Sequence, residues 1–178
     1  MKQLSIKRMN TIALFTALLC VSAYIVIPLP FTPTPITTQG IIVYLIGILL
    51  SPFEAFMTMI LYILLGIIGL PVFSGGRSGL GILLGPTGGY IIGFTISVVL
   101  ISLLKGKKNN VKRYFLLILL LGLPITYLFG SFSMRYHMNL RGTKLFYVSV
   151  LPFLPLDIIK AICSGTLGFT LKKKLRNI

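Results

Sequence analysis

Apolar residues occupy this chain in six long runs, and prolines, glycines and basic residues gather in the short segments between them. The runs cover residues 11–27, 37–50, 53–70, 88–104, 114–132 and 148–171. Most approach the length of about 20 residues that an α-helix needs to cross a hydrocarbon core roughly 30 Å thick. The second run is short for that purpose, so we expect it to be tilted or buried among other helices. The pattern predicts six membrane-spanning helices.

Prolines mark where several of these runs end or bend. Four of them lie between residues 28 and 35, a spacing that excludes a helix and predicts an extended connector. Pro124 falls inside the fifth run and predicts a kink there. Pro152 and Pro155 break the sixth run, and Pro155 is favourable in the first turn of a new helix.

The composition agrees with a membrane protein. Of the 178 residues, 56% are hydrophobic and only 11% are charged. A soluble domain of this size has too little interior for so much apolar surface. The formal net charge of +15 reflects basic residues at the ends of the apolar runs, as in membrane topology. They do not form the polar face that nucleic-acid binding requires, so no nucleic-acid partner is expected.

The positions of the basic residues predict the orientation in the membrane. If the N-terminus is cytoplasmic, twelve basic residues fall in cytoplasmic segments and four in outer segments, while Lys160 stands apart in the sixth run. This asymmetry places both termini in the cytoplasm and requires an even number of spans. The cytoplasmic set is Lys2, Lys7, Arg8, Lys105, Lys107, Lys108, Lys112, Arg113, Lys172, Lys173, Lys174 and Arg176, and the outer set is Arg77, Arg135, Arg141 and Lys144.

We therefore expect an all-α integral membrane protein. It would be a compact bundle of six transmembrane helices that forms a single domain over residues 1–178, with both termini cytoplasmic and the lipid bilayer as its solvent.

The chain has only two acids, and one of them lies within an apolar run. Glu54 is at a helix boundary and needs no special role. Asp157 lies three residues before Lys160, so the two side chains share one face of a helix. Either charge alone near the bilayer centre costs about 2.5–3.5 kcal/mol, and the pair partly neutralises itself. The pair is either a structural ion pair that steadies a broken helix or a polar anchor for a ligand.

The connector between the third and fourth runs, residues 69–90, has seven glycines between positions 75 and 89. Glycines allow backbone groups to approach a ligand closely. At membrane depth such backbone either packs within protein or lines a cavity. The segment is not a phosphate-binding P-loop, because no Lys-Ser or Lys-Thr follows the glycines. It is either part of a binding site or a flexible surface loop.

Other candidate chemistry is sparse. Ala13 and Ala17 form a small-xxx-small pair that permits close helix packing, within the bundle or against a partner. His137 is the only histidine, and Cys20 and Cys163 lie far apart without the spacing of metal ligands. No nucleophile has a base and an orienting group, and no nucleotide-binding motif occurs. We expect no catalytic residue, metal or cofactor, so the energy for any uphill transport must come from another protein.

Four stretches, in this order and spacing, resemble the BioY family, the biotin-binding S-components of energy-coupling factor (ECF) vitamin transporters. Each stretch alone is weak, but the four together are specific, and the resemblance covers nearly the whole chain. The stretches are Pro28–Thr37, Gly69–Phe73, Leu84–Tyr90 and Leu151–Ala161.

The resemblance implies a six-helix substrate-binding subunit in a bacterial-type plasma membrane, with the biotin site near the outer face. Residues 69–90 would form part of the site and its lid. Asp157 and Lys160 fall on the family's Asp-x-x-Lys motif. Ala13 and Ala17 match the small-residue patch that docks on the transmembrane coupling protein. Two ABC-type ATPases would hydrolyse ATP, and this subunit would be a transport protein and not an enzyme.

The resemblance also suggests how biotin would be held. Its ureido ring offers two N–H donors and a carbonyl acceptor, and its tail ends in a carboxylate. We expect Asp157 to accept from a ureido N–H, and Lys160 to orient Asp157 or donate to a ligand oxygen. Arg77 is the candidate for the carboxylate. The remaining expected contacts are Phe31, Phe73 and Tyr90 as pocket walls, with Gly85 and Thr87 from the lid.

The chain departs from the family pattern in two places. Leu156 stands where the family usually has glycine before the aspartate, and residues 131–141 are more basic than expected and lack a frequent tryptophan. The alternatives are an S-component for a different vitamin, or a small membrane enzyme or channel. The motif set argues against the first. The lack of a catalytic constellation or a repeated pore-lining polar face argues against the second.

Overall fold

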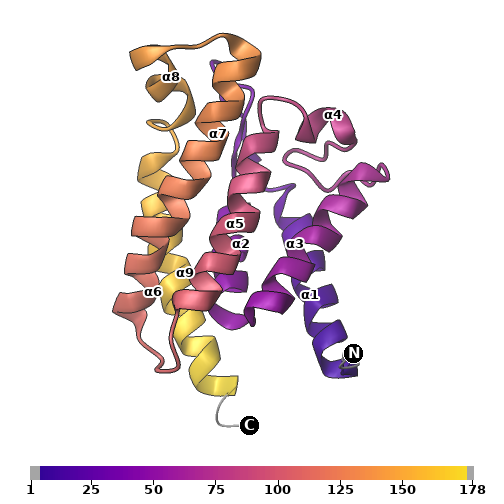
Figure 1. The fold of residues 1–178 in the computed structure, drawn as a ribbon, viewed down its shortest axis with the longest axis vertical. Coiled ribbons are helices and arrows are strands. Elements are labelled where there is room, and N and C mark those ends of the chain that lie inside the picture. Colours follow the sequence, from indigo (N-terminus) through magenta and orange to yellow (C-terminus); the bar gives the residue numbers. More distant parts are fainter. Residues whose placement is uncertain (1–4, 176–178) are drawn as a thin grey trace.

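Long helices standing side by side make up most of the computed structural model, which describes residues 5–175 (Figure 1). Lys2 and Arg176, two of the basic residues assigned to the cytoplasmic set, lie outside the described residues. The elements are α1 (Ile6–Ser22), β1 (Val26–Ile27), β2 (Ile36–Thr37), α2 (Gln39–Leu49), α3 (Pro52–Ile67), α4 (Leu80–Leu83), α5 (Gly88–Leu104), α6 (Val111–Leu117), the π-helical turn η1 (Ile118–Gly122), α7 (Leu123–Met138), α8 (Gly142–Ser149) and α9 (Leu154–Leu175).

The first apolar run changes from helix to strand. α1 ends at Ser22, so the predicted extension of this helix to Ile27 is wrong. Val26 and Ile27 form β1, which pairs antiparallel with β2. These two residues are β-branched and precede Pro28, which disfavours helix and favours an extended chain. The proline-rich segment between the two strands is non-helical, as predicted.

The fifth apolar run forms one continuous helical stretch through α6, η1 and α7. The ring of Pro124 would collide with the carbonyl of Leu120 in a regular α-helix. The π-helical turn η1, Ile118–Gly122, lies directly before this proline and relieves the conflict. The expected irregularity at Pro124 therefore takes the form of a wide turn within a helix that continues. In the sixth run the break is confirmed, because α8 ends at Ser149 and α9 starts at Leu154.

Glu54 stabilises the start of α3. The backbone N–H of Glu54 donates to the hydroxyl of Ser51 (3.4 Å), and the Glu54 carboxylate accepts from the backbone N–H of Ser51 (3.0 Å). This reciprocal pair is a capping box. Arg8 on α1 lies 3.4 Å from the same carboxylate. Glu54 therefore lies at a helix boundary, as expected, and its capping role there was not anticipated.

The outer surface of the helices is strongly apolar. α6, η1 and α7 together, and α9, are long and apolar enough to cross a membrane, and α2, α3 and α5 are shorter apolar helices. Many leucines are at least half exposed, while tyrosines and a phenylalanine fill the interior. Such a surface is stable in contact with lipid and not with water. The exposed leucines include Leu14, Leu64, Leu103, Leu120 and Leu128, and the fully buried aromatic side chains are Tyr44, Tyr62, Tyr114 and Phe73.

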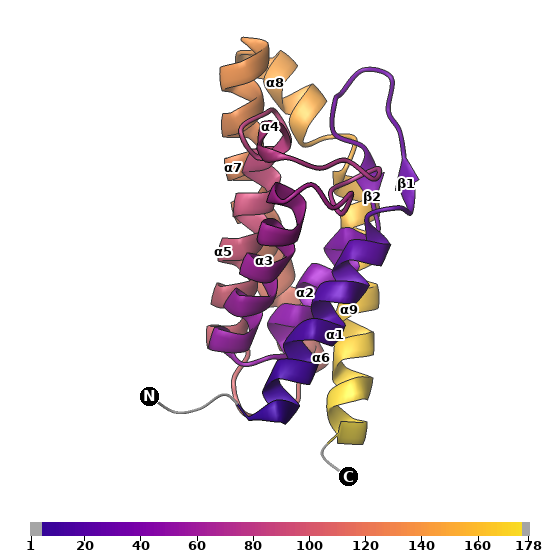
Figure 2. The ribbon, with the colours of Figure 1, turned by 90° about the vertical axis from the view of Figure 1, so that its right-hand side faces the viewer.

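The connectors are divided between the two ends of the bundle. The start of α1 and the last turn of α9 lie at the same end, and α4, α8 and the β1–β2 pair lie toward the opposite end (Figures 1 and 2). The C-terminal end of α1 is tied to the glycine-rich connector at that opposite end. The hydroxyl of Tyr24 donates to the carbonyl of Pro71 (2.6 Å), and the N–H of Gly75 donates to the carbonyl of Ala23 (2.9 Å).

α5 and α7 pack closely because glycines on α5 face the backbone of α7. A Cβ at Gly89 would overlap the carbonyl oxygen of Phe129, and one at Gly93 would lie 2.8 Å from the Cα of Thr126. Both glycines lie on one face of α5, four residues apart, as in close-packed membrane helices.

We expect Gly89→Ala to lower the free energy of unfolding by about 1–3 kcal/mol, because the new methyl group collides with backbone that cannot rotate away. Gly81→Ala is the matched control, since a Cβ at Gly81 meets no atom within 4 Å. Unfolding in detergent measures both variants. Equal stability of Gly89→Ala and Gly81→Ala would contradict the close packing of α5 and α7.

Candidate functional site

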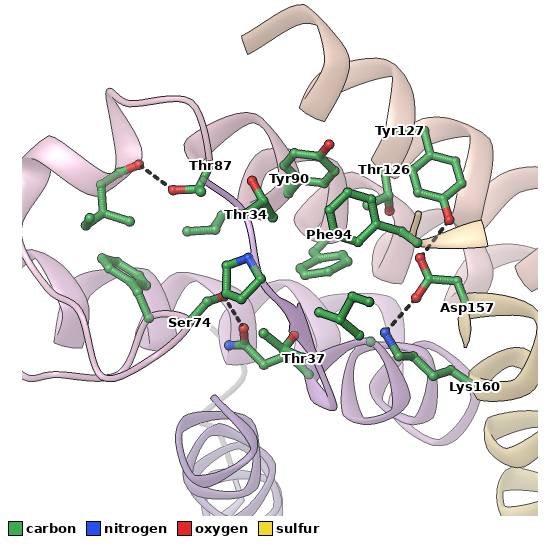
Figure 3. Close-up of a pocket in the computed structure, with 18 of the residues that line it drawn as sticks. Thr34, Thr37, Ser74, Thr87, Tyr90, Phe94, Thr126, Tyr127, Asp157 and Lys160 are labelled. Atoms are coloured by element: carbon green, nitrogen blue, oxygen red, sulfur yellow. Dashed lines mark hydrogen bonds and ion pairs between the residues drawn. The ribbon is translucent and has the colours of Figure 1, made fainter. Parts of the chain in front are cut away.

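A cavity of about 680 Å³, including its open mouth, lies toward the end of the bundle that carries α8. Figure 3 shows many of the side chains that line it. Apolar and aromatic side chains line most of it, with polar groups among them, as is typical of small-molecule sites. α2, α5, α7 and α9 form its walls, and the proline-rich segment and the glycine-rich connector cover it. The lining residues are Thr34, Pro35, Ile36, Thr37, Gln39, Gly40, Tyr44, Phe73, Ser74, Arg77, Ile82, Thr87, Tyr90, Ile91, Phe94, Thr126, Tyr127, Phe153, Asp157 and Lys160.

Asp157 on α9 is held from two directions. The ammonium of Lys160 donates to one carboxylate oxygen at 2.6 Å, and the hydroxyl of Tyr127 on α7 donates to the other at 2.7 Å (Figure 3). The Asp157 and Lys160 side chains are only 16% and 13% exposed. Asp157 also lies in the first turn of α9, where the helix dipole favours a negative charge. The carboxylate is therefore fixed in place.

This arrangement retains capacity for a ligand. Each carboxylate oxygen accepts one hydrogen bond here, and an ionised carboxylate can accept about four. The Lys160 ammonium has three donors and uses one of them on Asp157. The group can therefore bind a ligand that offers both an N–H donor and a neighbouring acceptor.

Polar groups from the glycine-rich connector lie across the cavity from Asp157 (Figure 3). The hydroxyl of Ser74 donates to the side-chain oxygen of Gln39 (2.8 Å), and the amide nitrogen of Gln39 donates to the hydroxyl of Tyr62 (2.7 Å). Arg77 donates through Nε to the carbonyl of Ser74 (2.9 Å). Within residues 5–175 this is its one side-chain hydrogen bond, so four of the five guanidinium N–H donors remain for an anion.

The glycine-rich connector takes the shape that places Arg77 here. Phe73 and Arg77 exchange backbone hydrogen bonds of 2.9 and 3.2 Å, which close a tight turn. Gly75 and Gly76 form that turn with φ of 75° and 71°, a region that side chains disfavour. The glycines therefore build a defined turn over the cavity.

Aromatic side chains make the apolar part of the lining. Phe73 is fully buried and meets Tyr62 edge to face, with ring centroids 5.5 Å apart. Tyr90 is fixed by donating its hydroxyl to the carbonyl of Ser149 (2.7 Å), and its ring lies 6.1 Å from that of Phe153. These contacts hold the aromatic rings in place, so they form apolar walls between Asp157 and the turn that carries Arg77.

Thr34 in the proline-rich segment presents a buried hydroxyl to this cavity. Its oxygen has no hydrogen-bond partner among residues 5–175. Burying such a group without a partner costs about 1–3 kcal/mol, so a ligand atom at this position would be stabilised.

The structure brings together most of the residues singled out from the sequence. Six of them line the cavity: Phe73, Arg77, Thr87, Tyr90, Asp157 and Lys160. Two expected contacts lie outside the lining. Phe31 is 54% exposed in the proline-rich segment, and the carbonyl of Gly85 accepts from the hydroxyl of Ser133 (2.8 Å), which fastens the connector to α7. The proline-rich segment instead reaches the cavity through residues 34–37.

Several lining residues were not anticipated from the sequence. Tyr127 is 30 residues from Asp157 and meets it only because α7 and α9 approach each other. Gln39 could have been found from the sequence, because it is a polar amide near the start of an apolar run. Leu156, at the position that usually holds glycine, is absent from the lining. Within residues 5–175, no three His, Cys, Asp or Glu side chains form a metal-binding group.

Ala13 and Ala17 lie away from the cavity. Both are exposed on α1, so this small-residue face does not contribute to packing inside the bundle. The pair remains a candidate surface for a partner.

Comparison with known proteins gave consistent matches over almost the whole chain. The family model described as "BioY family" matches residues 1–177. The probable biotin transporter BioY of Pyrococcus horikoshii is 39% identical over 87% of this chain and 90% of its own length. The biotin transporter BioY of Thermotoga maritima is 37% identical over 90% of this chain and 92% of its own length.

A solved structure is similar in fold. It is a crystal structure at 2.1 Å of the S-component for biotin from an ECF-type ABC transporter. The TM-score is 0.86 at 27% identity, covering 97% of this chain and 94% of the other. The mostly helical architecture therefore matches that of an ECF S-component.

A double-mutant cycle separates the structural role of the ion pair from any role in binding. In the ligand-free protein, Lys160→Met leaves a largely buried carboxylate with Tyr127 as its remaining partner, and we expect a loss of about 3 kcal/mol in the free energy of unfolding. Asp157→Asn combined with Lys160→Met removes both charges and should cost clearly less than Lys160→Met alone. Unfolding in detergent measures the cycle. Strictly additive losses would show that the two charges do not interact.

Proposed function

This chain belongs to the BioY family, and we propose on that basis that it is the biotin-binding subunit of an ECF-type transporter. One observation carries the proposal. The cavity holds a fixed carboxylate and ammonium on one side and an arginine with free donors on the other. Biotin has matching chemistry, with a ureido ring at one end and a carboxylate at the other.

The ureido ring would lie against Asp157 and Lys160. Asp157 accepts a hydrogen bond from a ureido N–H, and Tyr127 holds the carboxylate so that its remaining lone pairs face the ligand. Lys160 orients Asp157 and has donors left for the ureido carbonyl. Charge-assisted hydrogen bonds of this kind are stronger than neutral ones, and burial in an apolar cavity strengthens them further.

The rest of biotin would occupy the apolar lining and reach the turn over the cavity. The thiophane ring and the tail lie against aromatic walls such as Phe73, Tyr90 and Phe94. Arg77 binds the tail carboxylate with its free guanidinium donors. The Thr34 hydroxyl gains a partner when the ligand is bound.

The chain is a transport protein and not an enzyme, and it needs no cofactor of its own. ATP would be hydrolysed by two ABC-type ATPases, coupled through a transmembrane partner protein. Ala13 and Ala17 form the docking face for that partner, because both are exposed and small enough to let a helix approach closely.

The chain crosses the plasma membrane six times, with both termini in the cytoplasm. The spans are α1, α2, α3, α5, the stretch from α6 to α7, and α9. The basic residues support this orientation, because the end of the bundle where α1 starts and α9 ends carries most of them. The cavity then opens toward the outside, where biotin is captured.

The ligand assignment is tested by the compound that the protein retains. The purified protein is denatured and the released small molecules are identified by mass spectrometry, with biotin expected. Calorimetry then measures affinity, because the chain has no tryptophan to report binding. Recovery of another vitamin, such as thiamine or riboflavin, would exclude biotin as the substrate.

Asp157→Asn and Lys160→Ala should each weaken biotin binding by about 1–3 kcal/mol. The first removes the negative charge that strengthens the hydrogen bond to the ligand, and the second removes a buried donor. Lys107→Ala is a suitable control, since Lys107 is exposed between α5 and α6. Calorimetric titration compares the three variants. Unchanged affinity in both cavity variants would leave Asp157 and Lys160 with a structural role alone.

Replacing Ala13 and Ala17 with leucine should leave biotin affinity unchanged and impair both assembly with the coupling protein and biotin uptake. The added side chains block close approach of a partner helix. Thr166→Leu with Thr170→Leu is the matched control, four residues apart on the exposed face of α9. Co-purification and uptake assays measure the effect. Normal assembly of the alanine variant would rule out this docking face.

A further inference from the structure

One exposed face of α7 carries a continuous apolar row. Leu128 is 65% exposed, Phe132 is 71% exposed and Tyr136 is 77% exposed, at intervals of four residues. Residues at this spacing lie one above the other on a helix. Leu120 in the preceding π-helical turn is 64% exposed as well. α7 leads to the end of the bundle where it meets α8 (Figure 1), and the row follows this helix.

A basic hollow lies at the upper end of this row, and we name it the α7–α8 corner. Asn139 ends α7 in the left-handed conformation (φ 52°), which asparagine tolerates, and turns the chain toward α8. The hollow measures about 590 Å³, including its open mouth. Its lining residues are Phe132, Arg135, Tyr136, Asn139 and Arg141.

The two arginines have no acidic partner that this chain can supply. Its only acids are Glu54 and Asp157. Asp157 is bonded to Lys160 and Tyr127, and Glu54 caps α3 at the other end of the bundle. Lys144 in the first turn of α8 adds further positive charge. An anion for this corner must therefore come from outside the chain.

We propose that the α7–α8 corner binds the phosphate of an anionic phospholipid head group, with the acyl chains lying along the apolar row of α7. Guanidinium groups bind phosphate oxygens in pairs, so Arg135 and Arg141 supply the head-group contact. Phe132 and Tyr136 supply the aromatic surface typical of the boundary between hydrocarbon and head groups.

The apolar row distinguishes a lipid from a free phosphate. A soluble anion would use the arginines alone and gain nothing from Leu128 or Phe132. A lipid matches both parts, because its charged and apolar portions are joined in the same order as the hollow and the row. The site is separate from the cavity at Asp157 and shares no lining residue with it.

The absence of tryptophan from the chain allows a local reporter. Phe132→Trp places a single fluorophore in the corner and keeps an aromatic side chain. The full-length protein is reconstituted in phosphatidylcholine vesicles that contain phosphatidylglycerol, with either lipid brominated to quench the tryptophan. We expect phosphatidylglycerol to be preferred at this site on the order of tenfold, because two arginines attract its charged head group.

Arg135→Gln with Arg141→Gln, in the same background, should abolish the preference. Lys107→Gln with Lys108→Gln removes the same charge at the opposite end and should retain it. The thermal unfolding midpoint confirms that each variant is folded. Equal quenching by the two lipids before mutation, or loss of the preference in both double variants, would overturn the proposal.

Inorganic phosphate at constant ionic strength tests the source of the anion. Phosphate should not relieve quenching by brominated phosphatidylglycerol, because it cannot occupy the apolar row. Relief by phosphate would show that the corner binds a soluble anion, and this result would overturn the assignment to a lipid.

Discussion

A carboxylate inside a lipid-covered bundle needs hydrogen-bond donors around it, and the architecture of this site follows from that requirement. Asp157 receives Lys160 from its own helix and Tyr127 from α7, so the charge holds two helices in a fixed relation. An unpaired charge at this depth would cost several kcal/mol, which makes the partners as necessary as the acid itself. A group fixed in this way is also prepared for a ligand, because little freedom remains to be lost on binding.

Local sequence signals located the long helices and only part of the site. Apolar runs and prolines located the helices, since both act within a few residues. Pro155 marked the start of α9 and thereby the position of Asp157 at its N-terminus. Tyr127 was missed because its contact depends on how α7 packs beside α9, which no local pattern encodes. Phe31 was expected in the lining, but the extended segment points other residues, such as Thr34, into the cavity.

The two ends of the bundle use positive charge differently. Toward the end where α1 begins, arginine and lysine residues lie near the helix termini, as the proposed orientation requires. At the other end, Arg77 is drawn into the cavity by a glycine turn, while Arg135 and Arg141 remain at the surface beside exposed aromatic rings. The roles proposed for these basic residues, in topology, ligand capture and lipid contact, therefore differ according to what surrounds each of them.

Two hydrogen bonds join the end of α1 to the glycine-rich connector that covers the cavity. A movement of α1 is therefore coupled to a movement of this cover. Ala23 and Tyr24 follow directly after α1 and bond to this cover, and Ala13 and Ala17 lie on that helix. A partner that displaced α1 would strain the cover and lower the affinity for the bound ligand. Thermodynamic reciprocity then requires the ligand-bound subunit to bind that partner less tightly by the same factor. In a competition for the partner, the ligand-free subunit would therefore have the advantage.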